Sequence, residues 1–167
     1  PVHLFTGRSL TQGNLLQAIA DFNQALKLNS RDLQALYQRG LAHRQQQDLT
    51  QAIADFNEAI VIDPELADAF YQRGLAYAAQ KNYRYALEDY NQALLLRPNN
   101  PDIIFQKAVV FAKLEQYIEA VESLNLVLRL QPTNAAALYR RGYAYFQQND
   151  QTQALQDFNQ ALALNLD

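Results

Sequence analysis

The chain has 167 residues, of which 49% are apolar and 19% are charged, a composition typical of a folded protein of ordinary domain length. Its 14 basic and 17 acidic residues give a net charge of −3, and because phosphate neutralisation requires a basic excess, this argues against nucleic-acid binding. The absence of cysteine excludes disulfides and thiolate metal sites, and no segment reaches the roughly 18 consecutive apolar residues needed for membrane insertion.

The opening segment, PVHLFTGRSLTQ, is too short and too polar for a secretory signal. The lack of a signal favours a cytoplasmic location, but the compartment stays open because the native start of the chain is not evident. The sequence begins at Pro1 and contains no methionine, which favours a chain cut from a longer polypeptide.

Two blocks of sequence return along the chain at a fixed interval of 34 residues. One block reads AIADFNQAL, AIADFNEAI, ALEDYNQAL, AVESLNLVL and ALQDFNQAL, and its copies begin at Ala18, Ala52, Ala86, Ala120 and Ala154. The other precedes it as ALYQRGLAH, AFYQRGLAY, IIFQKAVVF and ALYRRGYAY, beginning at Ala35, Ala69, Ile103 and Ala137. Because a period of about 20 to 50 residues marks a stacked supersecondary unit, the sequence predicts a repeat protein.

Each unit has the apolar spacing of two helices joined as a hairpin. In the second unit Leu36, Gly40 and His43 share one face of a first helix, and Ala52 and Phe56 share one face of a second. A glycine inside a helix costs about 1 kcal/mol relative to alanine, so its return in other units indicates close packing of the two helices where alanine leaves room.

The ends of the helices are also marked in the sequence. A residue before proline is disfavoured in the α region, so helices should end as Pro64, Pro98 and Pro132 approach. Asn100 and Asn134 are candidate N-caps for the helices that follow.

This pattern resembles the tetratricopeptide repeat, a family built from 34-residue helix-turn-helix units. The family's bulky fourth residue, its glycine at position eight and its aromatic at position eleven correspond to Leu36, Phe70, Ile104 and Leu138, to Gly40, Gly74 and Gly142, and to Tyr77, Phe111 and Tyr145. The third unit also matches the later alanine, aromatic, alanine and proline with Ala86, Tyr90, Ala93 and Pro98. At position eleven of the second unit, His43 departs from the pattern.

The resemblance implies an all-α fold, an α-solenoid wound as a right-handed superhelix of about five repeats and ten helices. We expect a single domain over residues 1–167, with a partial repeat at 1–32 followed by repeats at 33–66, 67–100, 101–134 and 135–167. The first helix of the partial repeat is irregular, since Gly7 lies one place later than expected. The fourth repeat has Ala108 and Leu124 where its siblings have glycine and an aromatic, so its packing should shift while its hairpin is preserved.

In such a solenoid the first helices line a concave groove. Their groove-facing residues form an aromatic and apolar stripe, which we predict to bind a peptide: Tyr37, Leu41, Arg44, Tyr71, Leu75, Phe105, Val109, Tyr139, Tyr143 and Phe146. Packing between repeats is an equal alternative for the tyrosines at position five. Position nine is less easily explained by packing, because the resemblance implies a polar residue there in many members.

The resemblance also argues against one activity of the family. Members that clamp the C-terminal carboxylate of heat-shock chaperones use lysine and asparagine at positions five and nine of one repeat, and lysine and arginine at positions two and six of another. In this sequence only Arg140 matches its position, so we predict no clamp for an acidic chaperone tail.

A second periodic set is ionic and comprises Arg39, Asp55, Arg73, Asp89, Arg141 and Asp157, with an asparagine in every unit at Asn23, Asn57, Asn91, Asn125 and Asn159. We interpret the set as a hydrogen-bonded ladder between repeats. The alternative is that the same groups line the groove edge and bind the peptide backbone.

Catalysis has little support in this sequence, and no enzyme activity is predicted. His43 occupies a position typical of a packed core residue, and His3 lies in the irregular first unit. We find no metal-ligand spacing, no glycine-rich phosphate loop and no serine matched to a histidine, so no catalytic residue, metal or cofactor is expected.

The leading hypothesis is a non-catalytic scaffold that holds a partner protein's peptide in the groove. The alternatives are a structural spacer or self-assembling array within a longer protein, and a regulatory domain of an enzyme whose catalytic part is absent. Because few residues follow Leu162, the last repeat should expose an apolar face, which predicts end-to-end association or a following segment.

Overall fold

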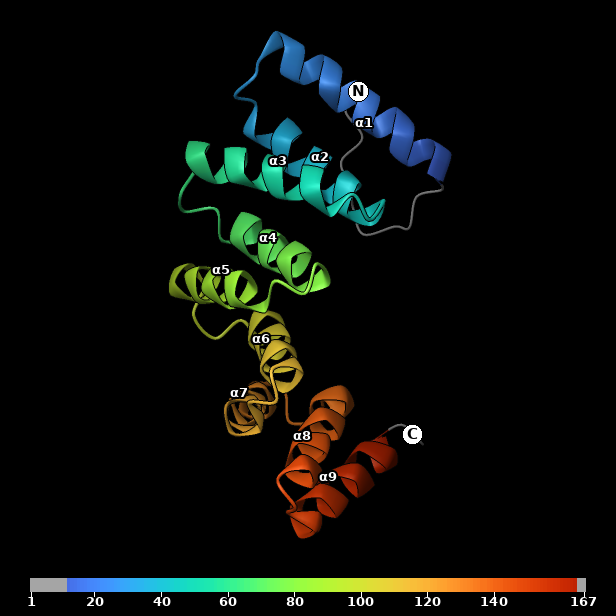
Figure 1. Cartoon of the computed structure of the whole chain (residues 1–167), viewed down its shortest axis with the longest axis vertical. Helices are drawn as coiled ribbons and strands as arrows, with labels where there is room; N and C mark the ends of the chain where they lie inside the picture. Colours follow the sequence, from blue (N-terminus) through green and yellow to red (C-terminus); the bar gives the residue numbers. More distant parts are fainter. Residues whose placement is uncertain (1–11, 165–167) are drawn as a thin grey trace. The chain divides into compact units, whose positions relative to one another are not determined.

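The computed structural model describes residues 12–164, and this part of the chain forms nine α-helices and no strand (Figure 1). They are α1 (Gln12–Leu28), α2 (Leu33–Gln45), α3 (Leu49–Ile62), α4 (Ala67–Ala79), α5 (Tyr83–Leu96), α6 (Pro101–Lys113), α7 (Tyr117–Leu130), α8 (Ala135–Gln147) and α9 (Gln151–Leu164). The all-α fold class is therefore confirmed. The expected tenth helix, with His3 and Gly7, falls outside the described residues.

The contacts divide the chain into two units, of which the first ends at Leu96 and the second begins at Arg97. In the first unit α2 packs on α3 and α4 on α5 as hairpins, while α1 packs on α2 and α3 on α4. In the second unit α6 packs on α7 and α8 on α9, and α7 joins the two hairpins through α8. The single domain over residues 1–167 remains a prediction.

Small residues let the two helices of each hairpin approach closely. A Cβ atom added to Gly40 would lie 2.7 Å from the ring of Phe56, and one added to Gly74 would lie 2.7 Å from the ring of Tyr90. The close approach is thus confirmed, with the aromatic ring as the nearest neighbour rather than the alanine of the second helix. The fourth repeat keeps a packed core with Ala108 and Leu124, both almost fully buried.

The turn inside each hairpin contains one residue in the left-handed region. These residues are Gln47, Lys81, Glu115 and Asn149, with φ between 59° and 64°. In the first of these turns the amide of Asp48 donates to the carbonyl of His43, and the amide of Gln47 donates to that of Arg44. This pair of bonds is the Schellman motif, which satisfies the last carbonyls of the helix and reverses the chain.

Side chains cap several of the helices, among them α6 and α8. Asn100 accepts the amides of Asp102 and Ile103, and Asn134 accepts the amide of Ala137. Both predicted N-caps are therefore confirmed. These caps fix where α6 and α8 begin, and so fix which residues of these two helices point away from the hairpin core.

Candidate functional site: a pocket in the second unit

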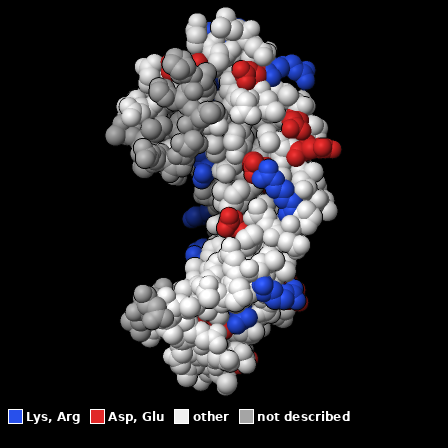
Figure 2. All heavy atoms as spheres, turned by 180° about the vertical axis from the view of Figure 1, so that it is seen from behind, with Lys and Arg blue, Asp and Glu red and all other residues white. Residues whose placement is uncertain are grey.

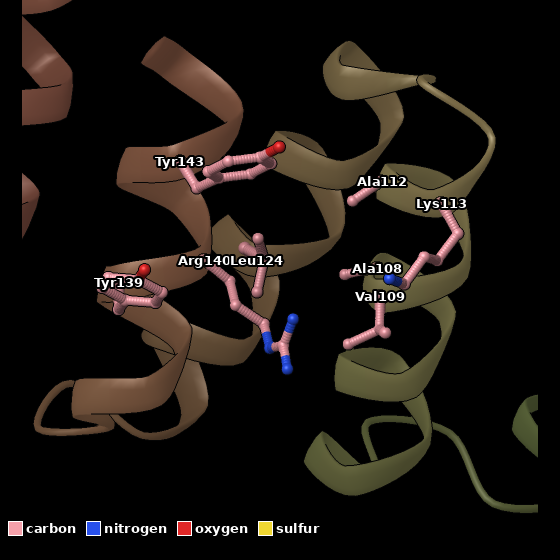
Figure 3. A pocket seen from close by; sticks show the side chains of 8 residues that line it. All are labelled: Ala108, Val109, Ala112, Lys113, Leu124, Tyr139, Arg140 and Tyr143. Atoms are coloured by element: carbon pink, nitrogen blue, oxygen red, sulfur yellow. The ribbon is translucent and has the colours of Figure 1, made fainter. Parts of the chain in front are cut away.

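The second unit contains a pocket of about 260 Å³ between α6, α7 and α8 (Figure 3). Its lining is Ala108, Val109, Ala112, Lys113, Leu124, Tyr139, Arg140 and Tyr143. Two cationic and no acidic side chains belong to this lining. The pocket therefore combines an apolar interior with a positive edge.

Three of the predicted groove residues meet at this pocket, namely Val109, Tyr139 and Tyr143. The two tyrosines are exposed, with 59% and 43% of their surface accessible to solvent. Tyr117 of α7 contacts Tyr143 edge to face at a ring distance of 6.5 Å, which orients the Tyr143 ring. Phe146 is exposed on the same helix but does not line the pocket.

The pocket is open because the fourth repeat lacks an aromatic at position 124. In three other hairpins the ring of the second helix packs against a tyrosine of the first, as Tyr71 packs on Tyr90 at 6.1 Å and Tyr139 on Phe158 at 5.5 Å. Leu124 is shorter than these rings, so Phe105 has no ring to meet there, and the space is left between α6 and α8.

A second small residue keeps the same space free. Ala112 lines the pocket, whereas Arg44 occupies the equivalent position two repeats earlier. Arg44 is half-buried, with its Nε atom buried, so its side chain occupies the corresponding region of the first unit. The sequence marks Ala108 and Leu124 as a change of side-chain volume in the fourth repeat, but it does not predict the pocket or the part that Ala112 plays in it.

The positive edge comes from two helices. The guanidinium of Arg140 lies over the Phe105 ring at 5.5 Å from its centroid, which holds the side chain against α6. Lys113 reaches the same space from the last turn of α6, so the two cations approach it from opposite sides (Figure 3). The charged side chains of the lining are both positive, and a carboxylate would be attracted to them.

The predicted groove residues of the first unit are less accessible. Tyr37, Leu41, Arg44, Tyr71 and Leu75 are all half-buried. The Tyr37 ring packs 5.9 Å from that of Phe56, in the same arrangement as Tyr71 on Tyr90. Both ring contacts lie within one repeat, so they are contacts of the hairpin and do not test the alternative of packing between repeats.

The ionic set forms one hydrogen-bond pattern three times. Arg73 donates from Nε and Nη2 to the carboxylate of Asp89 at 2.9 and 2.6 Å, and from Nη1 to Asn57 of the preceding repeat at 2.7 Å. The other two copies join Arg39 to Asp55 and Asn23, and Arg141 to Asp157 and Asn125. The three aspartates are buried, so their carboxylates do not line a surface.

Burial and pairing shift the pKa values of this ladder in two directions. The hydrogen bonds that Arg73 donates to Asp89 raise the pKa of Arg73, and those that Arg141 donates to Asp157 raise the pKa of Arg141. Burial raises the pKa of Asp89 by more than the hydrogen bond from Arg73 lowers it. The hydrogen bonds from Arg73 thus offset part of the cost of burying the Asp89 carboxylate.

The fourth repeat does not use this pattern within the hairpin of α6 and α7. Lys107 stands at the arginine position, and its ammonium lies 5.6 Å from the centroid of the Phe111 ring. Ser123 stands at the aspartate position and donates to the carbonyl of Glu119 at 2.9 Å. The same repeat thus differs from its siblings both in the ladder and at the pocket.

His43 lies in a packed position, as predicted. Its ring nitrogens are 3.9 Å from Asp55 and 4.0 Å from Asp48, beyond hydrogen-bond distance. Across residues 12–164 no group of His, Asp and Glu is arranged to hold a metal ion. In the same range, no helix is both long and apolar enough to traverse a bilayer.

Charged side chains are sparse and of mixed sign on the face seen in Figure 2. Helical hairpins that repeat along the chain define an all-α repeat protein of the solenoid class. The family model described as TPR repeat matches residues 40–81 and 108–149, and the one described as tetratricopeptide repeat matches 67–100 and 135–167. The chain belongs to the tetratricopeptide repeat (TPR) family.

Solved structures agree with this assignment. A crystal structure of MamA aligns with a TM-score of 0.88 at 21% identity, covering 92% of this chain and 90% of that one. MamA from Desulfovibrio magneticus RS-1 aligns with a TM-score of 0.87 at 19% identity, covering 92% and 87%. YrrB, described as a TPR protein with an unusual peptide-binding site, aligns with 0.82 at 25% identity, covering 93% and 80%. A search of curated proteins found no match.

These comparisons confirm the resemblance drawn from the repeat pattern. TPR proteins are generally non-catalytic scaffolds, and the repeats and their structural neighbours support a protein-interaction scaffold.

Proposed function

We propose that this protein is a non-catalytic scaffold that binds a peptide segment of a partner protein against its first helices. The observation that carries the proposal is the exposure of Tyr139 and Tyr143 beside the apolar pocket with Val109. Large exposed aromatics next to a concave apolar surface are typical of binding sites, because their burial supplies most of the affinity. The peptide-binding site attributed to YrrB supports the same class of ligand.

The test is selection of phage-displayed random octapeptides on the immobilised chain. The wild type should enrich peptides, and Tyr143→Glu should lose them, because it places a charge beside the pocket. Leu95→Glu is the matched control, since Leu95 is also exposed but lies on α5. Enrichment that is equal on all three proteins, or absent from the wild type, would contradict the proposal.

The groove residues of the first unit enter this proposal as a secondary surface. Leu41 and Leu75 are half-buried, whereas Tyr139 and Tyr143 of the second unit are exposed. A Leu75→Glu variant should therefore reduce peptide recovery less than Tyr143→Glu does. A larger loss on Leu75→Glu would move the main binding surface to the first unit.

We further propose that the ladder arginines stabilise the repeats and do not bind peptide, since each is committed to an aspartate and an asparagine. An acidic chaperone tail should not bind tightly, because the tyrosines and apolar residues at positions five and nine replace the clamp's lysine and asparagine. Micromolar binding of such a tail in fluorescence polarisation, about −8 kcal/mol, would overturn this expectation.

A second candidate role is self-association through the last hairpin, as in a structural array. Leu155 and Leu162 of α9 are exposed at 62% and 59%, which leaves an apolar face on this helix. Light scattering should show mass increasing with concentration, and Leu155→Glu should abolish the increase. A monomer throughout the millimolar range would contradict this role.

A further inference from the structure

We infer that the pocket between α6, α7 and α8 is a specificity pocket for one large apolar side chain, leucine or phenylalanine, located next to a carboxylate within a partner peptide. The inference rests on the proposed function and specifies the chemistry of its ligand. Its basis is the size, lining and charge of the pocket, together with the two side chains that are missing from it.

The size of the pocket suits one side chain. Pockets that enclose a whole small-molecule ligand are usually about 300 to 1,000 Å³, and this one is about 260 Å³. Its interior is formed by Ala108, Val109, Ala112 and Leu124, which offer no polar partner from their side chains. An apolar side chain is the group that gains most from leaving water there.

The charge of the pocket edge selects what lies beside that side chain. Lys113 and Arg140 reach the space from two helices, and no carboxylate belongs to the lining. Arg140 is positioned by the Phe105 ring, so less rotamer entropy is lost when its guanidinium pairs with a ligand. An aspartate or glutamate adjacent to the apolar residue is complementary to this edge, whereas a lysine there would be repelled.

In the second repeat the equivalent space is occupied by side chains. The residues equivalent to Leu124 and Ala112 two repeats earlier are Phe56 and Arg44, which occupy the same region with a ring and a long side chain. Restoring the sibling pair in the fourth repeat, as Ala108→Gly with Leu124→Phe, should fill the pocket and keep the hairpin, because glycine and an aromatic already face each other in three hairpins.

The site differs from a clamp for a chain terminus, since its cations lie at the edge of a pocket for a side chain. Octapeptides displayed through their C-termini have no free terminal carboxylate, so any enrichment must come from internal residues. The same library used for the proposed function therefore tests the inference separately.

Peptides enriched on the wild type should contain leucine or phenylalanine next to aspartate or glutamate. The Ala108→Gly/Leu124→Phe variant should bind a synthetic copy of the most enriched peptide about tenfold more weakly, because the buried side chain loses its pocket. Lys113→Gln/Arg140→Gln should lose the preference for acidic neighbours, and Arg129→Gln, an exposed control on α7, should keep it. Thermal melting by circular dichroism should show all variants folded.

Three outcomes are distinguishable. The acidic and apolar motif, lost on both double variants, supports the inference. Enriched peptides without that motif, or peptides that bind the double variants unchanged, overturn the inference and leave the proposed function standing. A wild type that enriches no peptide overturns both.

Discussion

Replacing Arg73 with methionine tests how much the ladder contributes to the stability of the folded chain. The substitution removes two hydrogen bonds, of 2.9 and 2.6 Å, from the Asp89 carboxylate, which is only 4% exposed. Breaking a buried ion pair by removing one partner costs about 3 to 5 kcal/mol. Because the Arg73 side chain is 19% exposed and water can reach its place, we expect the lower end, about 3 kcal/mol.

The assay is urea unfolding at neutral pH, followed by circular dichroism. Arg84→Met is the matched control, because its ion pair with Glu88 is exposed and should contribute less than about 0.5 kcal/mol. Replacing both members, as Arg73→Met/Asp89→Leu, should recover most of the loss, since an apolar pair of similar volume substitutes well for a buried ion pair.

The reasoning would be refuted if Arg73→Met cost no more than Arg84→Met, or if the double variant were no more stable than Arg73→Met alone. A fully folded Arg73→Met protein that loses affinity for the selected peptides would instead favour the groove-edge alternative for the ladder. The ladder account predicts unchanged affinity at temperatures where the variant remains folded.

Three further predictions concern the repeats. In the folded protein the pKa of Asp89 is raised above its ordinary 3.8, so the contribution of Asp89 to stability is largest below that value and is lost as pH rises through the folded pKa. Acidification protonates the carboxylate that Arg73→Met leaves without its arginine, so the deficit of this variant in unfolding free energy should shrink as pH falls. A deficit that grows would contradict this. Gly74→Ala should cost about 1 to 3 kcal/mol in urea unfolding because its Cβ would lie 2.7 Å from the Tyr90 ring, and adding Tyr90→Leu should relieve part of it; a neutral Gly74→Ala would disprove the contact. Lys81→Asn should raise the thermal midpoint, with a gain of about 0.5 kcal/mol, since its φ of 63° is less costly for asparagine, and Asn149→Lys should lose a similar amount; equal midpoints would contradict it.

The hairpins could be predicted from the sequence because most repeats carry the same residues at the contacts between their two helices. Glycine at 40 faces an aromatic at 56, and the same pair at Gly74 and Tyr90 leaves few other ways to pack two helices. The N-caps Asn100 and Asn134 were evident for the same reason, since a short polar side chain precedes a helical stretch in each case. Local chemistry and period agree at these positions.

The left-handed turns and the pocket could not be read in the same way. Three of the four turns place Gln47, Lys81 or Glu115 where glycine would be the usual signal, and only Asn149 indicates the conformation. The pocket exists because the side chains of Ala112 and Leu124 are small, and whether a ligand can reach it depends on the conformations of the side chains on α6 and α8. The volume change in the fourth repeat was visible, but its consequence required the packed structure.

The most direct test of the central claim is a methyl NMR titration of the protein with the most enriched octapeptide. Binding at the proposed site predicts shifts at the methyl groups of Val109, Ala112 and Leu124, which line the pocket, and none at the exposed methyls of Leu95 on α5. Saturable shifts confined to the pocket methyls would establish that peptide is held there. Shifts that avoid all three pocket residues would contradict the account.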